Sequence, residues 1–365
     1  MADVDAIVVG AGVWGCTLAR CLVESGRKVL VVERRSAVGG NARCEIDPDT
    51  GIEVHLYGSH IFHTHDAEVW TFIRRFTEFN GYRHKVLARY RGKTYFLPIG
   101  LALINAFFGT DLSPDEVRPF MEREGNSRAL FDAFFRGYTS KQWGRPPEEI
   151  DPSIIRRVPV RDSYDVNYFE DVWQGIPSRG YGEMFRRLLD HANIRVECGR
   201  DFVASDCACA SCPVFHSGPI DRLMDYEYGA LPWRSLRFEV ERIGMRDFQG
   251  SSVVNYTERD VPYTRIHEFK HYHPEWREVM ESRKTLVMRE YPMDWKRGDE
   301  PYYPIVTPES SAMLSRYREL AAKRFPHVVF GGRLGEFRYL DMDQAIASAL
   351  KLARQTTGGT DEQVR

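Results

Sequence analysis

The fold is decided by residues 6–33, AIVVGAGVWGCTLARCLVESGRKVLVVE. This stretch opens with an apolar run that ends on a glycine at position 10, as a short buried strand does. Residues 14–25 follow with apolar residues on one helical face and Gly26 as the stop, and residues 28–33 form a second apolar run that ends on Glu33. A strand, a helix and a second strand in this order predict a βαβ unit.

Three glycines lie between the first strand and the helix, in the spacing Gly10-x-Gly12-x-x-Gly15. The first permits a tight turn, the second lets the backbone approach a pyrophosphate, and the third lets the helix pack on the strand. The helix N-terminus then presents amides to the phosphates, and Glu33 is placed to accept hydrogen bonds from ribose hydroxyls. A glycine-rich turn alone can arise by chance, but with both strands, the helix and the acid it predicts a dinucleotide site.

The residues after Glu33 favour FAD over NAD. Arg34 follows the acid directly, and residues 39–41 (GGN) come after a four-residue spacer, as in FAD-binding members of this class. Residues 331–333 (GGR) close a late apolar strand, which in this class returns to the flavin. The helix that begins near Asp341 would direct its positive N-terminal dipole at the isoalloxazine, which favours an anionic reduced flavin.

The composition excludes several classes of protein. Hydrophobic residues make up 43% of the 365 and charged residues 28%, and a formal net charge of −2 provides no basic field for nucleic acid or acidic lipid. The longest apolar run, residues 96–109, contains Pro98 and is too short to span a bilayer. Because the sequence has no signal-peptide pattern and an odd number of cysteines, seven, we expect a cytoplasmic protein with reduced thiols.

Two groups of residues invite a metal interpretation. The three cysteines of residues 207–212 (CACASC) have no obvious fourth ligand, although Cys198 is conceivable, so free thiols are the favoured interpretation over a metal or redox site. His60 and His63 have the spacing of a metal pair but no third ligand in reach by sequence. We therefore predict no metal site.

Beyond the βαβ unit the chain changes character three times. Residues 82–97 alternate and turn at Arg91-Gly92 as a hairpin would, and residues 98–144 become helical, with a helix start at Ser113-Pro114. Strand-like pieces dominate from about 160 to 310, at 235–242, 252–256, 263–267 and 285–290. A late apolar strand, 328–331, then leads into a helix at 343–354.

These patterns predict an α/β fold, with an FAD-binding Rossmann-like domain, a helical insertion and an antiparallel β-sheet domain. The FAD-binding domain is expected to be discontinuous, built from residues 1–80, 180–220 and 318–365. A helical domain with a mobile lid is expected at 98–160. The substrate sheet is expected from residues 82–97, 161–179 and 221–317.

The chain resembles UDP-galactopyranose mutases of the bacterial type from about residue 3 to 350. Nine segments carry the likeness in the family's order and spacing: YGSHIFHT (57–64), GYTSKQWGR (137–145), RRVPVR (156–161), DVNYF (165–169), QGIP (174–177), SGPID (217–221), VPYTRI (261–266), GDEPYYP (298–304) and GGRLGEFRYLDM (331–342). The resemblance implies an isomerase that interconverts the pyranose and furanose forms of a nucleotide sugar, by default UDP-galactose. Such enzymes serve cell-wall or glycoconjugate biosynthesis.

The resemblance also implies the chemistry. Reduced FAD attacks the anomeric carbon through its N5 atom and displaces the nucleoside diphosphate, a flavin–sugar iminium follows, the ring opens, and a different hydroxyl recloses it. Because the flavin works reduced, an external reductant such as NAD(P)H is expected. Lid closure would keep water from the open sugar, and family members are commonly dimers.

A leaving diphosphate needs cations, for which guanidinium is the best geometric match. Arg157 and Arg265 match the family's two diphosphate-binding arginines, and Tyr303 and Tyr339 match tyrosines that hold phosphate oxygens. The expected catalytic set is Arg157, Arg265, Tyr303, Tyr339, Trp143 and His63, with Trp143 on the lid. The other expected substrate contacts are His84, Phe134, Tyr138, Thr139, Tyr168 and Asn255.

The expected cofactor contacts combine the glycine loop, the acid and the flavin-side segments. They are Gly10, Gly12, Val13, Trp14, Gly15, Glu33, Arg34, Gly40, Asn41, His60, Ile61, Arg333, Tyr339, Asp341 and Met342. In this interpretation both His60 and His63 lie against the flavin.

Five positions depart from the family pattern. His84 stands where the family usually has an asparagine that touches substrate, and Arg179 replaces a glycine. Phe269 replaces a histidine, Leu340 a tyrosine, and Ser59 a small alanine. These changes leave the flavin site and the arginine pair intact, but they leave the identity of the sugar and the nucleobase open.

Three functions therefore stay under consideration. The first is the mutase, acting on UDP-galactose or on a different nucleotide sugar. The second is a flavin-dependent oxidoreductase of the same fold, such as an amine or sugar oxidase, which would pass electrons to oxygen. The third is a flavoprotein that binds without catalysing.

Overall fold

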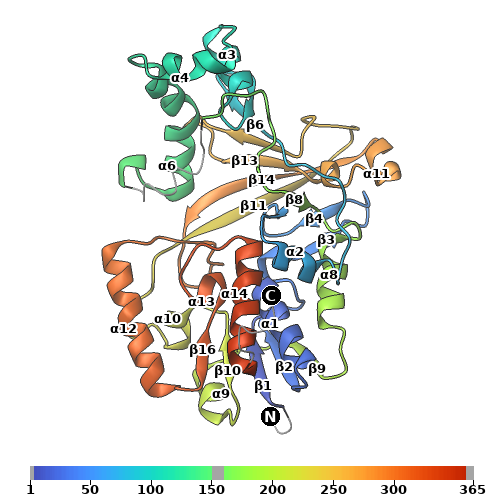
Figure 1. Cartoon of the computed structure of the whole chain (residues 1–365), viewed down its shortest axis with the longest axis vertical. Helices are drawn as coiled ribbons and strands as arrows, with labels where there is room; N and C mark the ends of the chain where they lie inside the picture. Colours follow the sequence, from blue (N-terminus) through green and yellow to red (C-terminus); the bar gives the residue numbers. More distant parts are fainter. Residues whose placement is uncertain (1–3, 150–159, 359–365) are drawn as a thin grey trace.

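Five parallel strands form the sheet that carries the glycine loop (Figure 1). The structure is a computed structural model that describes residues 4–149 and 160–358. The strand order is β16 (Val328–Phe330), β10 (Val214–His216), β1 (Ala6–Val9), β2 (Val29–Glu33) and β9 (Ile194–Cys198). The βαβ prediction is confirmed, because β1 and β2 pair in parallel and α1 (Val13–Glu24) connects them.

Successive side chains of β1 point to opposite faces of the sheet, and each face is covered by a layer of helices. Ala6 and Val8 belong to the core that includes α1, α8 (Gly180–Leu189) and α14 (Met342–Thr357). Ile7 and Val9 belong to a second core, which includes α12 (Pro308–Arg324) and the short α10 (Ile220–Leu223). A strand that is covered on both faces must be apolar throughout, which explains the run AIVV.

A seven-stranded sheet lies above the parallel sheet in Figure 1. Its order is β15 (Tyr303–Pro304), β11 (Trp233–Ile243), β14 (Thr285–Asp294), β13 (Arg265–Glu268), β12 (Val253–Tyr256), β6 (Val86–Tyr90) and β7 (Lys93–Leu97). The hairpin at Arg91-Gly92 is confirmed as β6–β7. The pairs are antiparallel except β6 with β12, which run parallel.

The helical insertion is the group at the top of Figure 1. It comprises α3 (Leu101–Phe108), α4 (Pro114–Met121), α5 (Asn126–Leu130), the π-helix η2 (Phe131–Arg136) and α6 (Gly137–Trp143). The predicted start of α4 is confirmed, since the Ser113 amide donates to the Glu116 carboxylate at 2.9 Å. Helix α6 continues from η2 and packs against β14, so its residues meet the large sheet.

Short elements join these layers. They are η1 (Gly40–Ala42), β3 (Cys44–Ile46), β4 (Glu53–His55), β5 (Phe62–Thr64), α2 (Ala67–Ile73), η3 (Pro147–Glu149), β8 (Trp173–Gly175), α9 (Ala204–Cys209), η4 (Phe269–Tyr272), α11 (Arg277–Glu281) and α13 (Gly332–Gly335). Strand β3 pairs with β4, and β5 pairs with β8. The predicted fold class is confirmed. Within the described ranges no helix has both the length and the apolar character that crossing a membrane requires.

Candidate active site

The glycines of the loop after β1 make contacts that only glycine allows. A Cβ on Gly15 would lie 1.9 Å from the Gly10 carbonyl oxygen, and Gly10 itself has a φ of +93°. A Cβ on Gly40, whose φ is +56°, would lie 2.8 Å from the Cα of Gly12. The two glycine segments therefore meet backbone to backbone at the N-terminus of α1, which is the cradle that a pyrophosphate needs.

Glu33 fixes the backbone around this cradle through hydrogen bonds. Its carboxylate is 6% exposed and accepts hydrogen bonds from the amides of Ala11 and Arg35, each at 2.8 Å. Each carboxylate oxygen has a further lone pair, which leaves acceptor capacity for a ribose hydroxyl. The structure therefore fits the role predicted for Glu33.

Arg34 and Arg35 both pair with the carboxylate of Glu300, and Arg35 also contacts Asn41 and Tyr57. The guanidinium of Arg34, a predicted cofactor contact, binds both carboxylate oxygens of Glu300, at 2.6 and 2.8 Å. Arg35 lies over the ring of Tyr57 at 4.0 Å and donates to the Asn41 side chain at 2.8 Å. Its Nη1 is buried without a hydrogen-bond partner in the described part of the chain, so Arg35 can receive an anionic oxygen beside Asn41.

The late GGR segment returns to the glycine loop, with Trp14 beneath it. A Cβ on Gly331 would lie 2.0 Å from the Trp14 indole, so the indole fills the space that a side chain would need. Arg333 lies over the Tyr339 ring at 4.8 Å and donates to the Leu340 carbonyl at 3.0 Å. Helix α14 then begins at Met342 after Asp341, as predicted.

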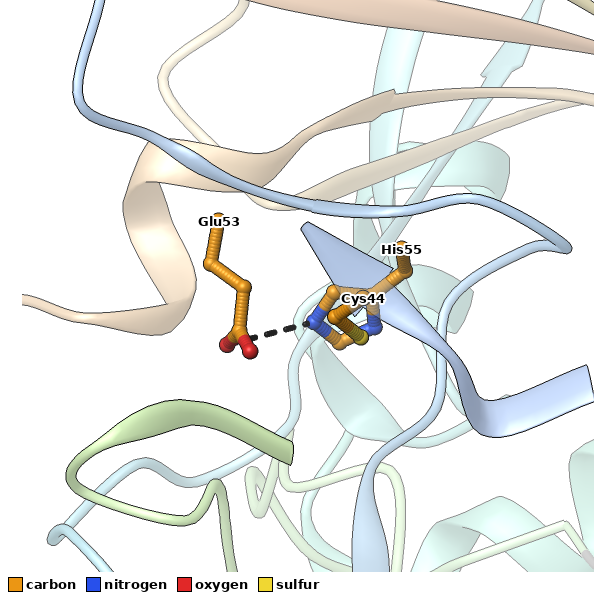
Figure 2. Close-up of side chains that lie close together, drawn as sticks. All are labelled: Cys44, Glu53 and His55. Atoms are coloured by element: carbon orange, nitrogen blue, oxygen red, sulfur yellow. Dashed lines mark ion pairs between the residues drawn. The ribbon is translucent and has the colours of Figure 1, made fainter. Parts of the chain in front are cut away.

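Three buried side chains near His60 resemble a metal site. The ligand atoms of Cys44, Glu53 and His55 lie within 4.8 Å of one another (Figure 2). However, the His60 amide donates to His55 Nδ1 at 3.0 Å, which places the proton of the neutral ring on Nε2. Because Nε2 is the nitrogen that faces Glu53, at 4.0 Å, it has no lone pair for a metal. His55 positions the His60 backbone instead.

The two predicted flavin-side histidines have different surroundings. His60 Nδ1 is buried and has no hydrogen-bond partner among the described residues, and burial lowers the pKa of His60 to about 4. An unpaired neutral nitrogen of this kind suits a polar cofactor edge. His63 is already engaged, since its ring stacks on Phe169 at 3.7 Å and its Nδ1 is 3.0 Å from Asp171.

A second polar group gathers around Arg265 on β13. Its guanidinium donates to the Tyr138 hydroxyl from α6, and its Nε lies 3.3 Å from the carboxylate of Glu290 on β14. Tyr168 and Tyr303 are also close enough to influence its charge. Burial raises the pKa of Tyr138 and Tyr303, so both phenols stay protonated and can donate to an anion.

Tyr303 connects the Arg265 group to the cofactor side. Its ring lies 5.9 Å from that of Tyr339 and 6.0 Å from the Trp143 indole, and Arg333 lies 6.0 Å from its centre. Two guanidinium groups and several phenols therefore face one region, next to the returning GGR segment. This combination binds a diphosphate well.

The remaining predicted substrate residues fall into four cases. His84 is 5% exposed, and its Nδ1 is 2.9 Å from the Tyr82 hydroxyl, with the Tyr168 ring 5.6 Å away. Thr139 and Asn255 are buried, at 9% and 8% exposed. Phe134 packs 5.2 Å from the Tyr95 ring in the core of the helical insertion. Arg157 lies outside the described residues.

Sequence reasoning missed Arg35, His267 and Glu290. The carboxylate of Glu290 becomes a partner of Arg265 only through the β13–β14 register, which places these two residues opposite each other. His267 is fully buried and lies 3.1 Å from Glu290. No local pattern marks either residue, because their meeting is a property of the sheet.

Comparison with known proteins identifies relatives over nearly the whole chain. The sequence profile of the UDP-galactopyranose mutase family matches residues 133–339, and that of an NAD(P)-binding Rossmann-like domain matches residues 8–76. A Klebsiella pneumoniae protein described as a probable UDP-galactopyranose mutase is 41% identical over 97% of this chain and 94% of its own length. The dTDP-fucopyranose mutase of Escherichia coli is 37% identical over 95% of this chain and 97% of its own length.

The fold has a counterpart among solved structures. A crystal structure of reduced UDP-galactopyranose mutase superposes with a TM-score of 0.75 and covers 98% of this chain and 96% of its own. At 15% sequence identity this likeness concerns the fold alone.

Proposed function

The chain belongs to the UDP-galactopyranose mutase family, and on that premise we propose that it interconverts the pyranose and furanose forms of UDP-galactose. The observation that carries the proposal is the convergence of Arg265, Tyr303 and Tyr339 beside the segment that returns to the glycine cradle. An isomerase of a nucleotide sugar must hold a diphosphate while the sugar reacts. The phenols and guanidinium groups of this region can do so.

We propose that the cofactor is FAD, active in its reduced form. The backbone cradle of Gly10, Gly12 and Gly40 would hold its pyrophosphate, and Glu33 its ribose. Arg35 is added to the predicted contacts, because its buried Nη1 lacks a partner among the described residues. The flavin, when bound reduced, would supply the nucleophile for the anomeric carbon.

The chain's own residues would bind, orient and shield the substrate. Arg265 and the phenols of Tyr303 and Tyr339 would hold the diphosphate before and after it leaves the sugar. Trp143, at the end of α6 and 6.0 Å from the Tyr303 ring, would cover the site and exclude water. His60, kept neutral by burial, would face the cofactor without adding charge.

A second substrate is supported by one comparison. The dTDP-fucopyranose mutase of Escherichia coli is nearly as similar to this chain as the Klebsiella relative is, at 37% against 41% identity. The substrate of that relative carries dTDP in place of UDP, and its sugar lacks the C6 hydroxyl of galactose. His84, in place of the usual asparagine, is the position in this site that favours a changed sugar contact.

The test is an isomerisation assay on purified flavoprotein, with and without dithionite. UDP-galactofuranose and dTDP-fucofuranose are supplied separately, and the pyranose products are separated by chromatography. Isomerisation only in the reduced protein supports the mutase, and the faster substrate names the sugar. Steady oxygen consumption with peroxide and no isomer would instead establish the oxidoreductase.

Four accompanying proposals rest on the sequence and on the family resemblance. The protein would act in the cytoplasm as a homodimer, in the supply of furanose sugars for cell-wall or glycoconjugate synthesis. Its flavin would be reduced by an external donor such as NAD(P)H. Light scattering of the purified protein and anaerobic bleaching of the flavin by NADPH would test the assembly and the reductant.

A further inference from the structure

Two of the positions that depart from the family pattern contact the same buried ring. The imidazole of His267 is 0% exposed on β13. The ring of Phe269 stacks on it at 5.8 Å with an interplanar angle of 8°. The hydroxyl of Ser59 lies 2.5 Å from its Nδ1. Both substitutions therefore alter the surroundings of one imidazole, which lies next to the predicted diphosphate site.

The hydrogen bonds of His267 fix where its proton lies. Its Nε2 is 3.1 Å from a carboxylate oxygen of Glu290, and an ionised carboxylate only accepts, so Nε2 carries the proton. In the neutral ring Nδ1 is then an acceptor, and the Ser59 hydroxyl must donate to it. The Ser59 oxygen in turn accepts from the Tyr272 hydroxyl at 2.6 Å.

The same carboxylate also faces Arg265. One oxygen of Glu290 accepts the hydrogen bond from His267 Nε2, and the other lies 3.3 Å from Arg265 Nε. Glu290 is 2% exposed, so water cannot replace either partner. The charge state of His267 therefore decides whether the negative charge of Glu290 is shared between two cations or faces Arg265 without a charged imidazole beside it.

We propose that Ser59 is a positioning residue of this site: its hydroxyl keeps His267 neutral, so that the Glu290 charge is reserved for Arg265 and fixes the guanidinium. The inference rests on the proposed role of Arg265 in holding the diphosphate. Phe269 contributes an apolar face, which also disfavours a charged imidazole. An alanine at position 59 would leave Nδ1 without its donor.

The loss of that donor has a predictable sign. A hydrogen bond to the unprotonated nitrogen stabilises the neutral ring, so its removal raises the pKa of His267. The charged or titratable groups near His267 are Arg265 and Glu290 on the sheet, His55, His60 and His84 in the adjoining segments, and Tyr272 beyond Ser59. Of these, Glu290 would gain an imidazolium as a second partner, and Arg265 would lose part of its counterion.

The first experiment measures the ring itself. Full-length, FAD-loaded protein labelled with ¹⁵N-histidine is titrated by NMR, as wild type and as Ser59→Ala. In the wild type His267 should show an unprotonated Nδ1 and a protonated Nε2 across the neutral range. A protonated Nδ1 in the wild type at pH 7 overturns the proposal, as does an identical His267 titration in the two proteins.

The second experiment measures the consequence for binding. UDP and dTDP are titrated calorimetrically into the same proteins at pH 6 and pH 8.5. Ser59→Ala should weaken binding at pH 6 about tenfold, the size of one lost charge-assisted contact, and at pH 8.5 less than about twofold. Ser59→Thr should restore the wild-type value, because it restores the hydroxyl. The control is Ser348→Ala, a half-buried serine on α14 whose hydroxyl donates to Glu336 at 3.3 Å.

The outcomes separate this inference from the proposed function. Equal weakening by Ser59→Ala at both pH values would reduce Ser59 to a packing residue and overturn the inference. A wild-type protein that binds neither UDP nor dTDP would refute the proposed function, while the His267 titration would still decide whether Ser59 sets the charge of that ring.

Discussion

Arg265 on β13 lies directly opposite Glu290 on β14, with its Nε 3.3 Å from a carboxylate oxygen that solvent cannot reach. Burial opposes ionisation of Glu290, but Arg265 and His267 outweigh it and lower the pKa of Glu290 to about 2. The guanidinium thus has a permanent counterion, while 26% of the Arg265 side chain stays accessible. A cation held in this way can bind a diphosphate without first being ordered.

Arg265→Ala should abolish turnover while the flavin spectrum is retained. We expect a fall in kcat/KM of about 100-fold or more, because a charge-assisted contact to the diphosphate is lost. Arg265→Lys keeps the charge beside Glu290 but loses the planar fork, so it should fold normally and lose most of the activity. The measurement is steady-state kinetics on reduced protein with the flavin content determined by absorbance.

The matched control for Arg265 is Arg289→Ala. Arg289 lies next to Glu290 on the same strand and binds Glu241 at 2.7 Å, on the side of the sheet away from Arg265. It should retain near-normal kinetics. Loss of bound FAD from Arg265→Ala would contradict the assigned role, because that role concerns substrate alone.

Gly40→Ala should weaken FAD binding more than it destabilises the protein. The added Cβ would lie 2.8 Å from the Cα of Gly12, so the two glycine segments would have to separate where the pyrophosphate is expected. Gly250→Ala is the control, because Gly250 also has a positive φ, +68°, but nothing lies near its Cβ position. Both variants carry the backbone strain of about 1 kcal/mol, and only Gly40→Ala should be purified with substoichiometric flavin.

Local patterns predicted the parts of this fold that depend on neighbours in the sequence. The strand at residues 6–9, the helix after it and the start of α4 follow from apolar periodicity and capping, which act over a few residues. The parallel pairing of β6 with β12 could not be predicted, because Leu87 and Val254 meet only in the folded sheet.

The candidate site divides in the same way. The glycine cradle and Arg265 are marked by motifs, whereas Glu290 and His267 become visible only once β13 and β14 are in register. Arg34 and Arg35 are adjacent and identical in type, and both bind Glu300, so the sequence cannot decide which of them also lies over Tyr57.

The free energy of unfolding should fall as the pH drops from 7 toward 5. Burial lowers the pKa of His60 and His216 to about 4 and that of His84 to about 3, against an unfolded value near 6.5. Stability from keeping these rings neutral is complete above pH 6.5, and it is lost below that value because the unfolded chain takes up protons first. Each ring contributes a slope of about 1.4 kcal/mol per pH unit in this window.

His216→Gln should flatten that pH dependence by the share of one ring. Urea unfolding at pH 7.5, 6 and 5 measures it, with His65→Gln as the control, since the His65 side chain is 64% exposed. The window lies above the range where carboxylates titrate, so histidines dominate it. An unchanged slope in His216→Gln would show that another group carries the acid sensitivity.

Lys141→Met should raise the KM for the nucleotide sugar while leaving FAD bound. The ammonium group of Lys141 donates to the carbonyls of Tyr256, Val261 and Tyr263, at 2.8, 3.0 and 2.9 Å, and so fastens α6 to the loop that precedes β13. Helix α6 carries Trp143, the residue proposed to cover the substrate. Releasing this helix should therefore weaken the closure of the site over substrate and leave the chemical step largely unchanged. We expect KM to rise about tenfold with a smaller change in kcat, since roughly 1.4 kcal/mol of ordering must then be supplied by substrate. Lys93→Met, at an exposed lysine on β7, is the control, and equal KM values in the two variants would sink the lid assignment.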